Sequence, residues 1–290
     1  MTSRERLTAV LERRIPDTVP ICVRGVSPFG DKMNWMGRHH ESYQRLRDFV
    51  RANGDILHGV GFDTGVFLSG ARVEEESRVI REDEDWSDLE HSIGTPQGPI
   101  RSVTRRSRHN LYEVMEVEHF IKDEEDYRRF MSIPYIPVRP DVKGIVEAKD
   151  REVGESGILS VFMPEAIAYV HQLFGSEGLA LWSVTQRERL MRLFETLGGR
   201  VLDYVGHLVR EGAGPLFSCA GAELAVPPLM SPGDFHDFVT VIDRPVHELV
   251  HAHGGYIMMP AASPFEPVLS EQAFEGYREY VRTGREYGRY

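Results

Sequence analysis

The sequence predicts an α/β protein built around a parallel sheet, and two features of the chain indicate this class. First, short apolar or β-branched runs alternate with amphipathic helical patterns over most of the chain. Second, the stretch 211–232 contains one complete unit: a buried apolar run at 215–219, a glycine-bracketed turn with Glu223, and a helix start at Ser231. The carboxyl ends of strands carry the chemistry in such folds, so Glu223 is a candidate site residue.

Composition limits the class of protein. The 290 residues are 41% hydrophobic, which suits one large domain over residues 1–290. The net charge of −11 argues against nucleic-acid binding, because the most basic stretch, 101–108, is typical of a solvated hairpin face. Cys22 and Cys219 are too few for a disulfide framework or a four-cysteine metal site. With no signal peptide and no membrane-spanning stretch, the expected location is the cytoplasm.

Five apolar or β-branched runs are expected to form parallel strands, at 19–23, 55–61, 157–163, 215–219 and 256–262. Helical patterns lie at 3–15, 41–53, 165–174, 185–209, 231–243, 246–250 and 270–288. Ser3, Thr185 and Ser231 are suitable N-caps for three of these helices. Pro245 is expected to interrupt its helix near Asp243, because proline has no backbone N–H to donate.

Between Thr64 and Lys143 the alternation of strands and helices stops. Alternating β-like runs with a turn signal at 94–99 predict a β-hairpin excursion outside the main sheet. Asp123 can cap a short helix that ends at Phe130. The three prolines within 133–140 then predict an extended connector.

Four short motifs occur in an order that resembles the uroporphyrinogen decarboxylase superfamily. They lie at 4–20, 95–98, 221–232 and 262–264, and the resemblance spans nearly the whole chain. It implies a TIM-type (β/α)8 barrel and an enzyme of porphyrin biosynthesis that decarboxylates acetate side chains of a tetrapyrrole without a cofactor. In that reaction an aspartate would hold the pyrrole nitrogens and arginines would hold the substrate carboxylates.

Two other functions stay open. The same superfamily contains zinc-dependent methyltransferases that act on corrinoids, so corrinoid-linked methyl transfer is the first alternative. This chain lacks their His-x-Cys pair, and no bound zinc or other metal is expected. The second alternative is a degenerate relative that binds a ligand without catalysis. The expected partner is therefore a small molecule, either a tetrapyrrole or a corrinoid, with no nucleic acid and no membrane.

Three residues are the candidate site, and each also has a structural interpretation. Asp63 follows the second strand, roughly where the decarboxylases place their aspartate, but turn capping explains it equally well. Glu223 could bind a cation or exchange protons, or it could accept loop hydrogen bonds. Arg24 could bind a substrate carboxylate or pair with either acid. We expect Asp63, Glu223 and Arg24 to open into one cavity at the carboxyl ends of the strands.

Three other residues with metal-binding or nucleophilic side chains favour structural roles. His251 and His253 lie at the end of a predicted helix, where imidazoles interact favourably with the negative end of the helix dipole. Cys219 is expected to be a small core residue, because nothing nearby in the sequence indicates a lowered thiol pKa.

The number of strands predicts that the barrel is incomplete. Five predicted parallel strands fall short of the eight that close a barrel of this type. The sheet is expected to be open between the strand at Leu216 and the strand at Tyr256. Exposed strand edges carry unpaired backbone groups, so a homodimer that covers them is a further expectation.

Overall fold

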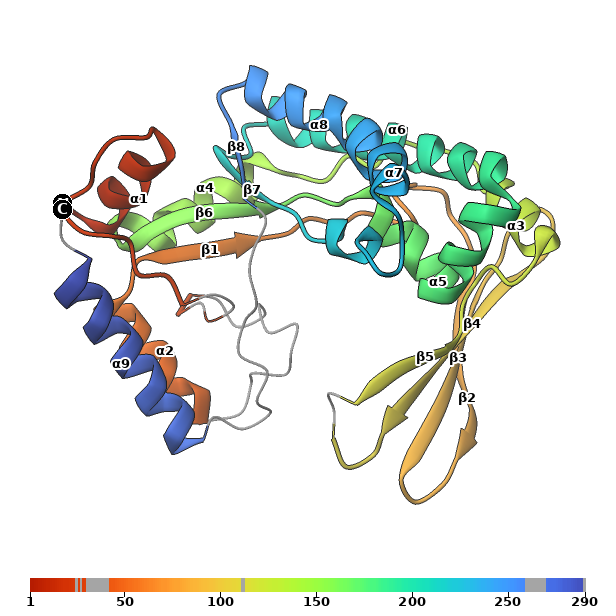
Figure 1. Cartoon of the computed structure of the whole chain (residues 1–290), viewed down its shortest axis with the longest axis horizontal. Coiled ribbons are helices and arrows are strands. Elements are labelled where there is room, and N and C mark those ends of the chain that lie inside the picture. The colour runs from red at the N-terminus through yellow and green to blue at the C-terminus, as the bar shows by residue number, and fades with distance from the viewer. Residues whose placement is uncertain (24–25, 27, 30–41, 111–112, 259–269, 289–290) are drawn as a thin grey trace.

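The protein is described here by a computed structural model that places residues 1–23, 26, 28–29, 42–110, 113–258 and 270–288. Arg24 and the 262–264 motif lie outside these residues. The α/β class is confirmed by a parallel sheet flanked by helices (Figure 1). Among the described helices, none combines the length and the apolar character needed to cross a membrane.

The parallel sheet contains four described strands in the order β1-β6-β7-β8. They are β1 (Ile56–Val60), β6 (Gly157–Phe162), β7 (Leu216–Ser218) and β8 (Tyr256–Met258). Gly157 is needed for the β1–β6 register, because a Cβ there would lie 2.0 Å from the carbonyl oxygen of Ile56. Four of the five predicted strands are therefore present and parallel, and the described strands do not form a closed barrel.

The predicted opening between the strands at 216 and 256 is wrong. β7 and β8 pair directly, with Leu216 opposite Tyr256 and Ser218 opposite Met258. After α8 the chain turns at Gly254, which has a φ of 74°, and runs back to the sheet. The Tyr256 N–H then donates to the Pro215 carbonyl at 2.8 Å, so β8 begins beside β7. In the described sheet the outer strands are β1 and β8. The expected homodimer stays a prediction.

The predicted strand at 19–23 is also wrong, although the segment does lie beside the start of β1. The Asp55 N–H donates to the Ile21 carbonyl at 2.9 Å, but the Ile21 N–H donates to the Asp55 carboxylate at 2.8 Å. Pro20 has no N–H to continue a ladder. The Asp55 carboxylate thus accepts a hydrogen bond that a backbone carbonyl would accept in a sheet. The segment is therefore not a strand.

Helices cover the sheet and extend beyond it (Figure 1). They are α1 (Ser3–Leu11), α2 (Ser42–Asn53), α3 (Glu124–Met131), α4 (Lys143–Val153), α5 (Ala166–Thr185), α6 (Arg187–Arg210), α7 (Pro232–Phe235), α8 (Val241–Ala252) and α9 (Glu271–Tyr287). Short turns η1 (Gly154–Ser156) and η2 (Ala222–Ala225) are 3-10 helices, and η3 (His236–Thr240) is a π-helix. The predictions did not include α4.

Three predicted helix boundaries differ from the structure. Thr2, not Ser3, caps α1. Thr185 does not cap α6, because its hydroxyl donates back to the Leu181 carbonyl at 2.9 Å. Pro245 lies inside α8 and does not break it. Just before α8, η3 is a π-helix, in which backbone hydrogen bonds join residues five apart and not four.

The excursion is a four-stranded antiparallel sheet that projects away from the rest of the molecule (Figure 1). Its strands are β2 (Glu75–Glu82), β3 (Trp86–Ile93), β4 (Ile100–Ser107) and β5 (Val114–Glu118). Its location outside the parallel sheet was predicted. Two of the four arginines in its basic stretch are ion-paired locally, Arg105 with Asp88 at 2.7 Å and Arg108 with Glu82 at 3.4 Å.

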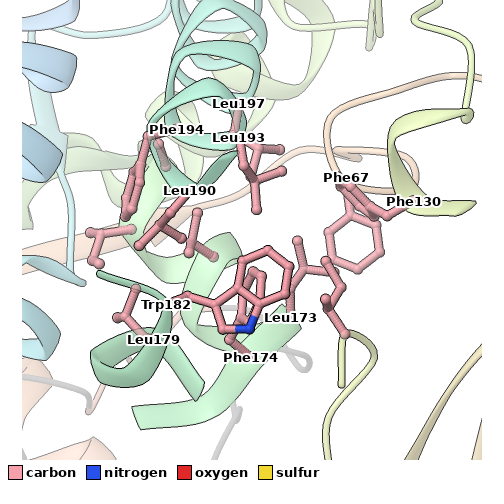
Figure 2. Close-up of a cluster of buried hydrophobic side chains, with 14 of the residues drawn as sticks. Phe67, Phe130, Leu173, Phe174, Leu179, Trp182, Leu190, Leu193, Phe194 and Leu197 are labelled. Atoms are coloured by element: carbon pink, nitrogen blue, oxygen red, sulfur yellow. The ribbon is translucent and has the colours of Figure 1, made fainter. Parts of the chain in front are cut away.

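The largest described core cluster lies between α5, α6 and the base of the excursion. Figure 2 shows Trp182 beside Leu173, Phe174 and Leu179, with the α6 side chains Leu190, Leu193, Phe194 and Leu197 above them. A second cluster packs α6 and α8 on the parallel sheet through Val161, Val205, Phe217 and Val250. The second cluster fixes α8 against α6 and the parallel sheet.

The N-cap of α3 gives a test of local stability. Asp123 Oδ1 accepts hydrogen bonds from the backbone N–H groups of Glu125 and Asp126, both at 2.9 Å. Asp123→Ala should lower the free energy of unfolding by about 1 kcal/mol, because both donors lose their acceptor. Urea denaturation measures this, with Asp123→Asn as the control that keeps a capping oxygen. An unchanged midpoint for the alanine variant would show that the cap contributes nothing.

Candidate functional site

The loops after β1, β6 and β7 each carry a carboxylate, and these loops leave the same edge of the parallel sheet. Asp63 follows β1, Glu165 follows β6 and Glu223 follows β7. In parallel sheets the carboxyl edge is where ligands and catalytic groups collect. The edge therefore holds both predicted acids, Asp63 and Glu223, together with Glu165, which the sequence predicts only as the start of a helix.

Glu165 is the buried member of this group, with 3% of its surface exposed. Its Oε2 atom is buried without a hydrogen-bond partner among the described residues. A Cβ on Gly221 would lie 3.2 Å from Oε2, so a glycine at 221 leaves room for the carboxyl group. Burial raises the Glu165 pKa to about 7, and the negative charge of Glu223 adds to the shift. Glu165 is thus poised to exchange a proton near neutral pH.

Cys219 and Asp243 lie close to Glu165. Cys219 directly follows β7 and is 1% exposed, and burial raises its thiol pKa to about 12. The thiol is therefore protonated and packs as a core group, as the sequence predicts. Asp243 comes from the first turn of α8 and is 6% exposed. Burial and then the charge of Glu165 raise the Asp243 pKa to about 7.

Asp63 and Glu223 are exposed, and both accept hydrogen bonds within their own loops. Asp63 Oδ1 accepts from the Gly65 N–H at 2.9 Å, and Glu223 Oε2 accepts from the Gly221 N–H at 2.9 Å. These are the turn contacts that the structural interpretation anticipates. They leave further acceptor positions on each carboxylate. A cavity shared by Asp63, Glu223 and Arg24 stays a prediction.

A buried arginine and a tyrosine support the loop that carries Asp63. The hydroxyl of Tyr204 on α6 donates to the Asp63 carbonyl at 3.2 Å. The loop then turns through Phe67 and Leu68, both with positive φ of 47° and 60°. Arg200, which is 5% exposed, donates to the Phe67 carbonyl at 3.0 Å. Non-glycine residues adopt this conformation at a cost, so the surrounding contacts must hold the turn in place.

No group of three or more metal-ligating side chains in the described residues has the geometry to hold a metal ion. His251 and His253 lie at the end of α8, as predicted. The Nδ1 atom of His251 is 3.0 Å from the Gly255 carbonyl oxygen, and that of His253 is 2.9 Å from the Leu249 carbonyl oxygen. In both contacts an imidazole nitrogen lies against a backbone carbonyl oxygen at the C-terminal end of the helix.

No protein-family model matches the sequence, and no curated protein matches it. Among solved structures, a methyltransferase from Methanosarcina mazei aligns over 98% of this chain and 81% of its own, with 14% sequence identity and a TM-score of 0.47. At this level the similarity assigns no role to any residue of the chain.

Proposed function

We propose that the chain is an enzyme that acts on a small molecule at the carboxyl edge of the parallel sheet, with Glu165 as its proton donor. One observation carries the proposal. A carboxyl group 3% exposed, at a strand end, has its pKa raised by burial to about 7. General acids work best when their pKa lies near the working pH, and such shifts are concentrated at functional sites.

The reaction that we propose is decarboxylation of acetate side chains on a tetrapyrrole, as the superfamily resemblance implies. Loss of CO₂ from a –CH₂–COO⁻ group leaves an electron pair on the methylene carbon. That carbon must take up one proton to become a methyl group, so each turnover consumes a proton. The protonated Glu165 carboxyl would supply it. Asp63 would accept hydrogen bonds from pyrrole N–H groups, and Arg24 would pair with a substrate carboxylate.

Glu223 has a supporting part in this proposal. It is exposed at the same edge, and its charge favours the protonated form of Glu165. In the proposed cycle, Glu165 donates its proton and is then reprotonated from solvent.

Turnover assays with purified protein test this function. We expect uroporphyrinogen to be converted to products with fewer carboxyl groups, without added metal. A second assay supplies methylcobalamin and a thiol acceptor. Methyl transfer without decarboxylation would replace the proposed reaction with the corrinoid alternative. If neither substrate reacts but uroporphyrinogen binds, the chain is a non-catalytic relative and the proposal fails.

A further inference from the structure

Arg200 is a buried cation without a counter-charge in the described part of the chain. Its side chain comes from α6 and is 5% exposed, and it forms an ion pair with none of the described carboxylates. Asp203, less than one turn further along α6, pairs instead with Arg139 at 2.7 Å. The Nε atom of Arg200 has no hydrogen-bond partner among the described residues. Burying an unpaired cation is costly, so the position of this side chain needs a reason.

The Arg200 guanidinium donates to backbone carbonyls that are distant in the sequence. Its Nη1 atom donates to the Phe67 carbonyl at 3.0 Å, and Nη2 makes a longer contact of 3.5 Å with the Ile133 carbonyl. One turn later on the same face of α6, the Tyr204 hydroxyl donates to the Asp63 carbonyl at 3.2 Å. The two side chains therefore hold both ends of the loop from Asp63 to Phe67, which follows β1 at the candidate site.

The turn that Arg200 contacts is strained. Phe67 and Leu68 have positive φ angles of 47° and 60°. Val66 and Ser69 close the turn through backbone hydrogen bonds of 2.9 and 3.0 Å. Two consecutive non-glycine residues in this conformation cost free energy, and they persist only where other contacts hold them. The bond from Arg200 to the Phe67 carbonyl is such a contact, and it lies at the centre of the turn.

The strained turn is linked to the Asp63 carboxylate. Asp63 Oδ1 accepts from the Gly65 N–H at 2.9 Å. A Cβ on Gly65 would lie 2.3 Å from the Ser69 carbonyl oxygen, so Gly65 packs directly against the closed turn. The same Ser69 carbonyl accepts the hydrogen bond from the Val66 N–H. A relaxed turn would therefore shift Gly65, and with it the donor that orients the Asp63 carboxylate.

We propose that Arg200 and Tyr204 are positioning residues, which hold the loop after β1 so that the Asp63 carboxylate keeps the orientation that binds substrate. The binding of pyrrole N–H groups by Asp63 rests on the function proposed above. The hold on the loop does not, because it follows from hydrogen bonds and backbone geometry. The unpaired buried cation then serves the site.

The first test examines the loop without substrate. Amide hydrogen exchange at Val66 and Ser69 reports on the two bonds that close the turn. Arg200→Met keeps a long apolar side chain but has no donor. In this variant both amides should exchange at least about 10-fold faster, the size of a lost hydrogen bond from a charged group. The amides of β6 should keep their wild-type rates, which shows that the fold is intact. Unchanged exchange at Val66 and Ser69 overturns the proposal.

The second test separates positioning from a merely structural role. Tyr204→Phe removes only the hydroxyl that donates to the Asp63 carbonyl. It should raise KM for uroporphyrinogen about five-fold and leave kcat unchanged, because Asp63 is proposed to bind the substrate. Tyr127→Phe is the matched control, since its hydroxyl donates to another backbone carbonyl, that of Arg189, also at 3.2 Å. This control should leave KM unchanged.

Arg200→Lys supplies the conservative variant. It keeps a charged donor, so it should recover part of the KM that Arg200→Met loses. If Arg200→Met does not fold, Tyr204→Phe decides the question alone, by its KM and by the exchange at Val66 and Ser69. A KM for Tyr204→Phe equal to that of the wild type overturns the proposal.

The exchange measurement is separate from the turnover assays. Faster exchange at Val66 and Ser69 in a protein that does not decarboxylate uroporphyrinogen would support the hold on the loop and remove the proposed function. Unchanged exchange in variants of an active enzyme would remove the positioning role and leave the function.

Discussion

Replacing Glu165 by glutamine is expected to lower kcat for the proposed decarboxylation by about 10²–10⁴-fold, the usual contribution of a general acid. Glutamine keeps the size of the side chain but has no proton to give at neutral pH. The side chain is 3% exposed, so its substitution does not alter the surface that meets solvent. Steady-state assays with uroporphyrinogen measure the loss, and KM should change little if the carboxyl acts mainly in the chemical step.

Two variants make this result interpretable. Glu177→Gln removes an exposed acid from the same helix, α5, and should leave kcat unchanged. Glu165→Asp keeps an acid with a shorter reach and should recover part of the lost rate. A glutamine variant that is folded and turns over substrate at the wild-type rate would show that Glu165 is not the proton donor.

The second large effect concerns stability. Glu165→Gln should make the protein more stable than the wild type at pH 8, while the difference at pH 5 should be small. In the unfolded chain a glutamate ionises near pH 4.5, whereas in the folded protein burial raises the pKa to about 7. The wild type therefore loses stability as pH rises between these values, because the unfolded state releases the proton first. The glutamine variant has no such proton to lose.

The pKa difference corresponds to about 3 kcal/mol at the usual conversion of about 1.4 kcal/mol per pH unit. Urea unfolding at pH 5 and pH 8 measures the gain as a difference between the two proteins, which cancels contributions from other groups. Glu177→Gln again serves as the control. Equal stability of Glu165→Gln and the wild type at pH 8 would mean that the buried carboxyl carries no pH-dependent cost. A real gain would place Glu165 among residues retained for function at the expense of stability.

The strand-end position of the site follows directly from local sequence. The apolar run before Ser218 and the glycine-bracketed turn after it place Glu223 at a carboxyl edge, and the structure agrees. The same reasoning applied to 157–163 could have identified Glu165, which directly follows another predicted strand. Glu165 is not singled out by its sequence context, because an acid just before a helix is commonly explained by its interaction with the helix N-terminus.

Long-range contacts could not be predicted in this way. The burial of Asp243 depends on how α8 packs against α6 and the parallel sheet, which are contacts between residues far apart in sequence. The pairing of β7 with β8 likewise depends on where the chain returns after α8, and counting strands gives no information about that. The segment at 19–23 has the composition of a strand, but the Asp55 side chain takes over one of its backbone hydrogen bonds. Composition alone does not reveal such a substitution.

The pH dependence of wild-type kcat tests the central claim most directly. If Glu165 must be protonated to deliver its proton, kcat for uroporphyrinogen decarboxylation should be constant in mild acid and fall as pH rises through about 7. A kcat that stays constant up to about pH 9, or that rises through neutrality, would contradict the assignment of Glu165 as the proton donor.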